Sequence, residues 1–92
     1  DATPTAPVAM SVFPTPSAGN VTLALQIPFA TEAVIIVRDV LGHEIWRKAI
    51  HSSSTREQIH IFQRGNLPAG LYHAVLHVGS GMVVTAKIVL AK

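Results

Sequence analysis

The sequence has 92 residues and few charges, which limits the classes of protein that it can encode. Only 13% of the residues are charged, whereas 49% are hydrophobic, so the composition predicts one domain with an apolar core and argues against disorder. The formal net charge of +2 is too small and too scattered to indicate a nucleic-acid or membrane surface. No apolar run approaches the ~18–20 residues that span a bilayer. The absence of cysteine excludes a disulfide framework and thiol chemistry.

The first seven residues differ in composition from the rest. Residues 1–7 contain two of the six prolines, with Thr and Ala between them, and are predicted to form an extended linker. They begin without an initiator Met, a basic segment or an apolar leader, so we expect the chain to be a piece of a longer protein. Residues 8–92 are expected to form the domain.

Short apolar runs separated by Gly and Pro turns fill this domain. Residues 20–27 alternate most clearly, with Val21, Leu23, Leu25 and Ile27 on one predicted face. In the same way we expect strands at residues 8–13, 20–27, 33–38, 44–50, 56–62, 71–78 and 82–90. There is no helical period and no helix cap. The sequence therefore predicts an all-β fold, a seven-stranded immunoglobulin-like β-sandwich.

Two predicted turns lie in the first half of the domain. Pro14 and Pro16 stop the first strand, and Gly19 is expected to let the chain reverse. Asp39 and Gly42 delimit a turn before the fourth strand, where the Asp39 carboxylate is expected to accept hydrogen bonds from its own backbone.

A further turn precedes the sixth strand. Pro68 and Gly70 predict a turn over Leu67 to Gly70, since Pro presets one backbone angle and Gly allows a positive φ. Tyr72 then begins an alternation that places it on the inner face, where its hydroxyl is expected to reach a backbone group.

The residues that could support catalysis or metal binding form no convincing site. His73 and His77 share a predicted strand face, but four strand residues separate them by roughly 13 Å, too far for one ion. Cross-strand pairing with His51 or His60 would be needed. The serines at positions 52–54 lie beside a histidine with no third triad member suggested, and the five carboxylates suggest no acid–base pair. We therefore expect no enzyme, no metal site and no cofactor.

Four motifs resemble those of a known family. They lie at residues 13–19 (Phe-Pro-Thr-Pro-Ser-Ala-Gly), 39–45 (Asp-Val-Leu-Gly-His-Glu-Ile), 67–72 (Leu-Pro-Ala-Gly-Leu-Tyr) and 87–92 (Lys-Ile-Val-Leu-Ala-Lys). In this order and spacing, residues 8–92 resemble the type A C-terminal sorting domain of the Bacteroidetes type IX (Por) secretion system. Two positions depart from the family pattern: Thr15 stands where Asn is usual, and His43 stands where Arg or Lys is usual.

The resemblance implies a secretion signal. Family members direct an attached cargo protein from the periplasm through the type IX outer-membrane translocon, assisted by shuttle proteins. A sortase-like cysteine peptidase then usually removes the domain on its N-terminal side, and the cargo stays at the outer-membrane surface or is released. The last strand could offer its edge to a receptor by strand addition, so recognition is expected at Lys87, Ile88, Val89, Leu90, Ala91 and Lys92.

Two other functions remain open. The domain could be retained without cleavage, as a surface-anchored or signalling interaction module. Alternatively, it could be an adhesive or carbohydrate-binding sandwich, which requires a row of exposed aromatic rings; burial of Phe29, Trp46 and Phe62 would exclude that. The edge at residues 82–86 is hydrophobic and has few charges, which also predicts a homodimer through strand edges.

Overall fold

The described part of the chain is built from seven β-strands. A computed structural model describes residues 8–27, 31–52, 57–79 and 81–92, and it places no helix in them. The strands are β1 (Ala9–Phe13), β2 (Val21–Gln26), β3 (Thr31–Asp39), β4 (Glu44–Ser52), β5 (Glu57–Phe62), β6 (Gly70–Val78) and β7 (Val83–Leu90). All seven predicted strands are present, and their bounds differ from the prediction by at most two residues.

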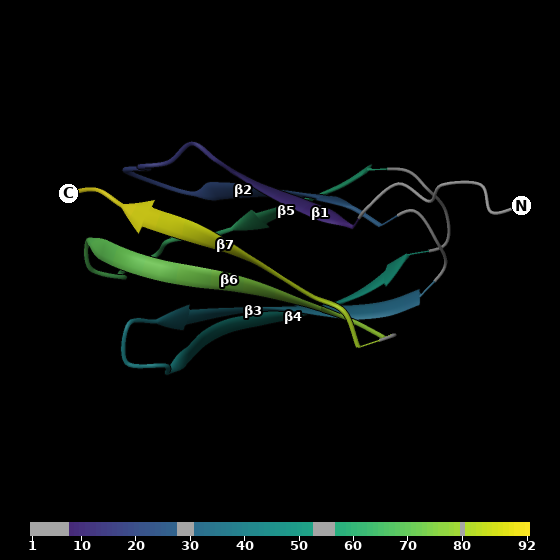
Figure 1. The fold of residues 1–92 in the computed structure, drawn as a ribbon. Coiled ribbons are helices and arrows are strands. Elements are labelled where there is room, and N and C mark those ends of the chain that lie inside the picture. The colour runs from purple at the N-terminus through teal and green to yellow at the C-terminus, as the bar shows by residue number, and fades with distance from the viewer. Residues whose placement is uncertain (1–7, 28–30, 53–56, 80) are drawn as a thin grey trace, which may run out of the picture.

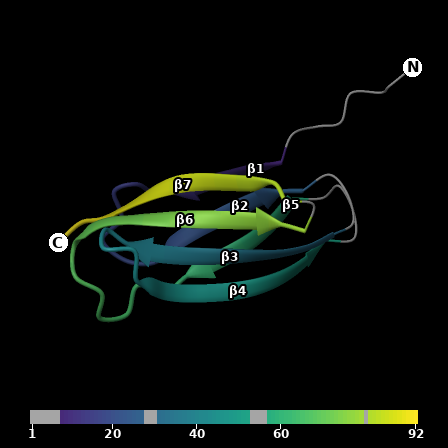
Figure 2. The same ribbon diagram turned by 60° about the horizontal axis from the view of Figure 1, so that its bottom comes forward.

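The strands form two antiparallel sheets that lie face to face (Figures 1 and 2). One sheet has the order β1-β2-β5 and the other β4-β3-β6-β7. The long central pair β3 and β6 is held in register from Ala33 opposite Val78 to Asp39 opposite Tyr72. The predicted C-terminal hairpin is confirmed as β6 and β7, with the N–H of Val78 donating to the carbonyl of Met82 at 2.8 Å.

The core lies between the two sheets and follows the predicted alternation. On β2, Val21, Leu23 and Leu25 are fully buried. On β6, the buried residues alternate with exposed or half-buried ones, as predicted for that strand. Residues from both sheets form one apolar cluster, which includes Ile35, Val37, Ile50, Phe62, Tyr72, Ala74, Leu76, Val78, Ile88 and Leu90. Burial of this surface is the main favourable contribution to folding.

One apolar pair faces outward. Ile59 and Ile61 share a face of β5, as predicted, but that face lies on the outside of the three-stranded sheet, where they are 53% and 47% exposed. Phe62 has the opposite parity and is buried. Because side chains alternate along a strand, burying Phe62 places the two isoleucines in solvent.

Two turns are organised differently from the prediction. The positive φ predicted at Gly70 is confirmed, at 152°. The hydrogen-bonded turn before β6, however, lies at Arg64–Leu67 and not over Leu67 to Gly70: the N–H of Leu67 donates to the carbonyl of Arg64 at 3.1 Å. Gly65 takes the left-handed backbone conformation there, with φ of 56°. The reversal after β1 does not use a positive φ at Gly19. It is held by Ser17, whose Oγ donates to the carbonyl of Asn20 at 2.9 Å.

The two flanks of the sandwich, where the sheets meet side by side, are closed by different groups. At the β1/β7 flank, Ser17 forms a parallel bridge with Leu90. At the β4/β5 flank, the rings of Trp46 and Phe62 meet edge to face, with centroids 5.5 Å apart. The first flank is therefore closed by backbone groups and the second by side chains.

Candidate recognition site

Three loops and the C-terminal residues gather at one end of the sandwich, here called the motif pole. It consists of residues 14–20, 40–43, 63–69 and 91–92. The pairings Asp39 opposite Tyr72 and Gly70 opposite Leu90 bring the ends of β3, β6 and β7 to this pole, which lies at the left in Figure 1. All four sequence motifs are at or beside it. The chain enters the domain at the other pole, where Ala9 pairs with Gln26.

The C-terminal segment is tied to the first loop by backbone hydrogen bonds. The N–H of Ser17 donates to the carbonyl of Val89 at 2.9 Å, and the N–H of Ala91 donates to the carbonyl of Ser17 at 2.8 Å. Ser17 is itself only 2% exposed. Residues more than 70 positions apart in sequence are thereby fixed to one another.

Arg64 connects three of the four parts of this pole. Its side chain donates to the carbonyls of Leu67 and Ala18 at 3.0 and 3.1 Å, and to that of Ala91. Its backbone N–H donates to Oδ1 of Asn20 at 3.1 Å. Sequence analysis missed Arg64, because a single arginine in a loop carries no local pattern that distinguishes it from a solvated side chain.

The six residues predicted for recognition divide by burial. Ile88 and Leu90 are 1% and 2% exposed and belong to the core. Val89 and Ala91 are half-buried, and only Lys87 and Lys92 are exposed. The segment is therefore the end of β7 followed by two further residues, and it presents two lysines.

The free edge of β7 is shorter than the strand. The carbonyl of Val89 accepts its hydrogen bond from Ser17, on the side of β7 that faces away from β6. Because backbone groups alternate along a strand, the N–H and C=O groups of Val83, Thr85 and Lys87 also point to that side. At the C-terminal end, Ser17 already occupies the edge. Strand addition is therefore closed at residues 89–91. Residues 83–87 of this edge pair with no other described strand, although β1 packs beside β7.

The β3–β4 turn confirms the predicted role of Asp39. Its Oδ1 accepts hydrogen bonds from the N–H groups of Leu41 and His43, both at 2.9 Å. The hydrogen bond from the His43 N–H is the main reason that the pKa of Asp39 is lowered from its ordinary value. Gly42 allows the turn through a φ of 89°.

The same turn exposes two apolar side chains. Val40 and Leu41 are 66% and 77% exposed at its tip. Sequence analysis predicted the turn but did not single out this pair; the available signal was two apolar residues between the Asp and the Gly of a turn.

Basic side chains form a row across the outer face of the four-stranded sheet. Arg38 lies opposite His73, and His73 lies opposite Lys87, on three neighbouring strands. We call these residues the basic row. The nearby Glu44 forms a bidentate pair with Arg47, at 2.9 and 3.0 Å, and this hydrogen bonding lowers the pKa of Glu44.

The histidines form no cluster of metal ligands in the described ranges. His43 pairs with Asp39 at 3.2 Å, and His51 pairs with Glu32 at 2.6 Å. No group of three His, Cys, Asp or Glu residues that could hold an ion occurs among the residues described. The polar loop that contains two of the three serines lies outside them.

The aromatic residues do not form a described binding platform. Phe62 is 1% exposed, and Trp46 is half-buried against it. Tyr72 is buried, and its hydroxyl donates to the carbonyl of Pro68 at 2.8 Å, as predicted. Phe29 lies outside the described residues. Phe13 is half-exposed.

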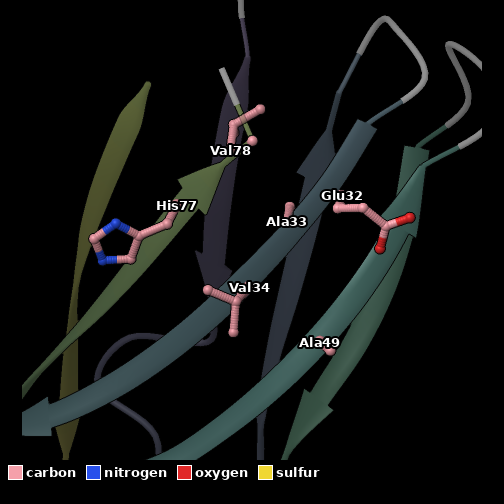
Figure 3. Close-up of a pocket in the computed structure, with 7 residues that line it drawn as sticks. Glu32, Ala33, Val34, Ala49, His77 and Val78 are labelled. Carbon is pink, nitrogen blue, oxygen red and sulfur yellow. The ribbon is translucent and has the colours of Figure 1, made fainter. Parts of the chain in front are cut away.

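A shallow depression of about 410 Å³ lies on the four-stranded sheet, away from the motif pole. Figure 3 shows Val34 on β3 between Ala49 on β4 and His77 on β6, with Glu32 farther along β3. The Glu32 carboxylate already pairs with His51. The depression is an apolar hollow left by small residues.

The comparison with protein families identifies the chain. Residues 11–91 match the family model described as the secretion system C-terminal sorting domain (Por_Secre_tail). The chain belongs to this family. No curated protein matches it. Within the described residues, no helix is long and apolar enough to cross a membrane.

Membership defines the general role of the sorting domain. The family is a C-terminal signal of the type IX system of Bacteroidetes and is not known as an enzyme. It implies interaction with the type IX machinery and export through the outer membrane toward the cell surface or the extracellular space.

Proposed function

We propose that this sorting domain directs an attached cargo protein through the type IX outer-membrane translocon, and that the machinery reads the motif pole. The supporting observation is the convergence of motifs that are spread over the whole sequence. Arg64 and Ser17 join the first loop, the third loop and the C-terminal segment at one end. The chain enters at the other end, so an attached cargo leaves the motif pole accessible.

The C-terminal residues contribute to recognition mainly through Lys87 and Lys92. These two are the exposed members of the predicted segment, whereas the aliphatic members pack inward or lie half-buried. A receptor that adds a strand would use residues 83–87. The same edge would serve a homodimer, supported by the 45% and 52% exposure of Met82 and Val83.

We also propose removal of the domain by a sortase-like cysteine peptidase on its N-terminal side, after transit through the periplasm with the help of shuttle proteins. The predicted linker, residues 1–7, lies outside the described residues. The β1 ladder begins at Ala9. Cleavage upstream of that residue would leave every described strand intact, so the signal would come away as a folded unit.

The strand orders support an immunoglobulin-like arrangement. A sheet of β1-β2-β5 opposite a sheet of β4-β3-β6-β7 corresponds to the immunoglobulin constant pattern with the fourth strand moved beside the third. In this arrangement the connections between sheets are loops at the two poles, where sequence can vary without disturbing the core.

Export of a reporter tests the proposed function. A periplasm-targeted fluorescent protein would carry residues 1–92 at its C-terminus in a type IX-competent bacterium, beside the reporter alone. We expect surface or medium fluorescence only with the domain. Retention of both reporters in the periplasm would contradict the proposal. An uncut fusion in the outer membrane would support export and would show that the domain is retained without cleavage.

The role of residues 87–92 in recognition has to be tested by substitution and not by deletion. Removing residues 87–92 would remove Ile88 and Leu90 from the core, so lost export would reflect unfolding. Lys87→Gln combined with Lys92→Gln keeps both core residues. We expect this variant to lower export while its melting temperature stays near that of the unmodified domain. Unchanged export would show that the two lysines are not read.

A further inference from the structure

The tip of the β3–β4 turn is the most exposed apolar feature of the described surface. Val40 and Leu41, at 66% and 77%, exceed every other exposed large hydrophobic residue there; the next are Ile59 at 53% and Val83 at 52%. Large apolar side chains at a loop tip gain nothing from exposure to water. Exposed apolar patches on folded domains commonly mark interaction sites.

This tip is held in one conformation by its own hydrogen bonds. Asp39 accepts from the N–H groups of Leu41, His43 and Gly42, the last at 3.0 Å through its backbone carbonyl. The N–H of Asp39 donates to the carbonyl of His43 at 3.1 Å. Arg38 donates from its side chain to the carbonyl of Gly42 at 3.2 Å. A turn fixed before binding loses little backbone entropy when it enters a partner.

The basic row begins directly beside the tip. Arg38 precedes the turn, and His73 and Lys87 continue the row across the sheet. Basic side chains placed opposite one another destabilise a sheet when charged. Asp39 is engaged by the turn and by His43, and Glu44 pairs with Arg47. Glu44 also lies opposite Arg38 on β4, and the charge of Arg38 helps to lower its pKa. Arg38 therefore already faces a carboxylate of its own sheet, and the part of the row that complements an acidic group on a partner is His73 and Lys87.

We propose that the Val40–Leu41 tip enters an apolar pocket with an acidic rim on a protein of the type IX machinery, and that the basic row contacts that rim. This inference rests on the proposed function. A folded protein fits better than an anionic membrane, because the Asp39 and Glu44 carboxylates lie at the base of the tip and would approach the lipid headgroups. Two apolar side chains also bury little area for a membrane anchor.

The reporter fusion tests the tip. Val40→Ser with Leu41→Ser leaves the turn hydrogen bonds in place, since they involve backbone groups and Asp39. We expect the exported-to-periplasmic ratio to fall by about tenfold or more, as for loss of interface anchors. The matched control is Ile59→Ser with Ile61→Ser, a second exposed apolar pair, which should export normally. Circular-dichroism melts of both purified variants check that they fold.

The basic row is tested separately. His73→Gln with Lys87→Gln should reduce export, whereas Lys48→Gln with His51→Gln, on the edge strand β4, should not. Normal export of the Val40/Leu41 variant would overturn the inference, even when the unmodified domain exports the reporter. Failure of the unmodified domain itself would count against the proposed function instead.

A vesicle assay distinguishes a lipid membrane from a protein pocket as the binding partner of the tip. Purified residues 1–92 and the Val40/Leu41 variant would be sedimented with phosphatidylglycerol vesicles. We expect neither to sediment. Sedimentation of the unmodified domain that the variant loses would identify lipid as the occupant and overturn the protein pocket.

Discussion

The two flanks of the sandwich are closed by different kinds of contact. At the β1/β7 flank, Ser17 occupies the backbone groups of Val89 and Ala91. At the β4/β5 flank, Trp46 and Phe62 fill the space between the sheets. Backbone hydrogen bonds fix the register of the segments they join, whereas side-chain packing depends on shape and volume. The first flank positions the C-terminal motif, and the second mainly stabilises the core.

The largest expected effect is at the side-chain flank. Phe62→Ala removes a fully buried ring from both the core cluster and the contact with Trp46. We expect a loss of about 3–5 kcal/mol in the free energy of unfolding, measured by urea denaturation. A loss below about 1 kcal/mol would mean that the flank collapses around the vacancy and that its packing is not specific.

The backbone flank should respond less to a side-chain change. Ser17→Ala removes the hydroxyl that donates to the carbonyl of Asn20 and accepts from the N–H of Gly19 at 3.2 Å. We expect a cost of about 1–2 kcal/mol in unfolding free energy. The bonds between Ser17 and residues 89 and 91 use backbone atoms and should persist.

Hydrogen exchange checks this persistence. The Ala91 amide should be protected in the unmodified domain and in Ser17→Ala, whereas the Lys87 amide, on the free part of the same edge, should exchange quickly. Equal exchange of the two amides would contradict the difference between the ends of β7.

A smaller effect is the coupling of the two rings. A double-mutant cycle with Trp46→Ala and Phe62→Leu should give a coupling energy of about 0.5–1.5 kcal/mol, the range for edge-to-face aromatic pairs. Additive costs would show that the two rings contribute independently to closing the flank.

The smallest effect is a pH dependence at the side-chain flank. Burial lowers the pKa of His60 from its ordinary value, and the charge of Lys48 lowers it further. The unfolded chain therefore binds a proton at higher pH than the folded domain. The free energy of unfolding is therefore highest above about pH 6.5, where His60 is neutral in both states. It decreases as the pH falls through the folded pKa of His60. His60→Gln should flatten this part of the stability curve, measured by thermal melts from pH 7.5 to 5. An unchanged slope would assign it to other groups.

The sequence predicted the strands because their pattern is local. Alternation over residues 20–27 and 71–78 identified the faces of β2 and β6, and the roles of Asp39 and Tyr72 depend on partners no more than four residues away. The arrangement of the motif pole depends on contacts across the chain. Arg64 reaches Ala18 and Ala91, and Ser17 reaches Val89, and a single sequence contains no pattern for such pairs.

The same reasoning explains the two local errors. Gly70 has the predicted positive φ, but the hydrogen-bonded turn closes before Pro68, with Gly65 in the left-handed conformation. Gly19 supplies no left-handed conformation, since a buried serine hydroxyl organises that loop. Composition located both loops within a few residues, and the hydrogen-bond partners determined their geometry.

Closure of the β1/β7 flank by residues 89 and 91 has a consequence for protein synthesis. The core receives Ile88 and Leu90, and the flank receives its second hydrogen bond from Ala91, only after the ribosome has reached these positions. A prematurely terminated product would lack a finished sandwich and an ordered motif pole. Under the proposed function, the domain would thus report that translation has run at least to Ala91, and truncated cargo would carry no export signal.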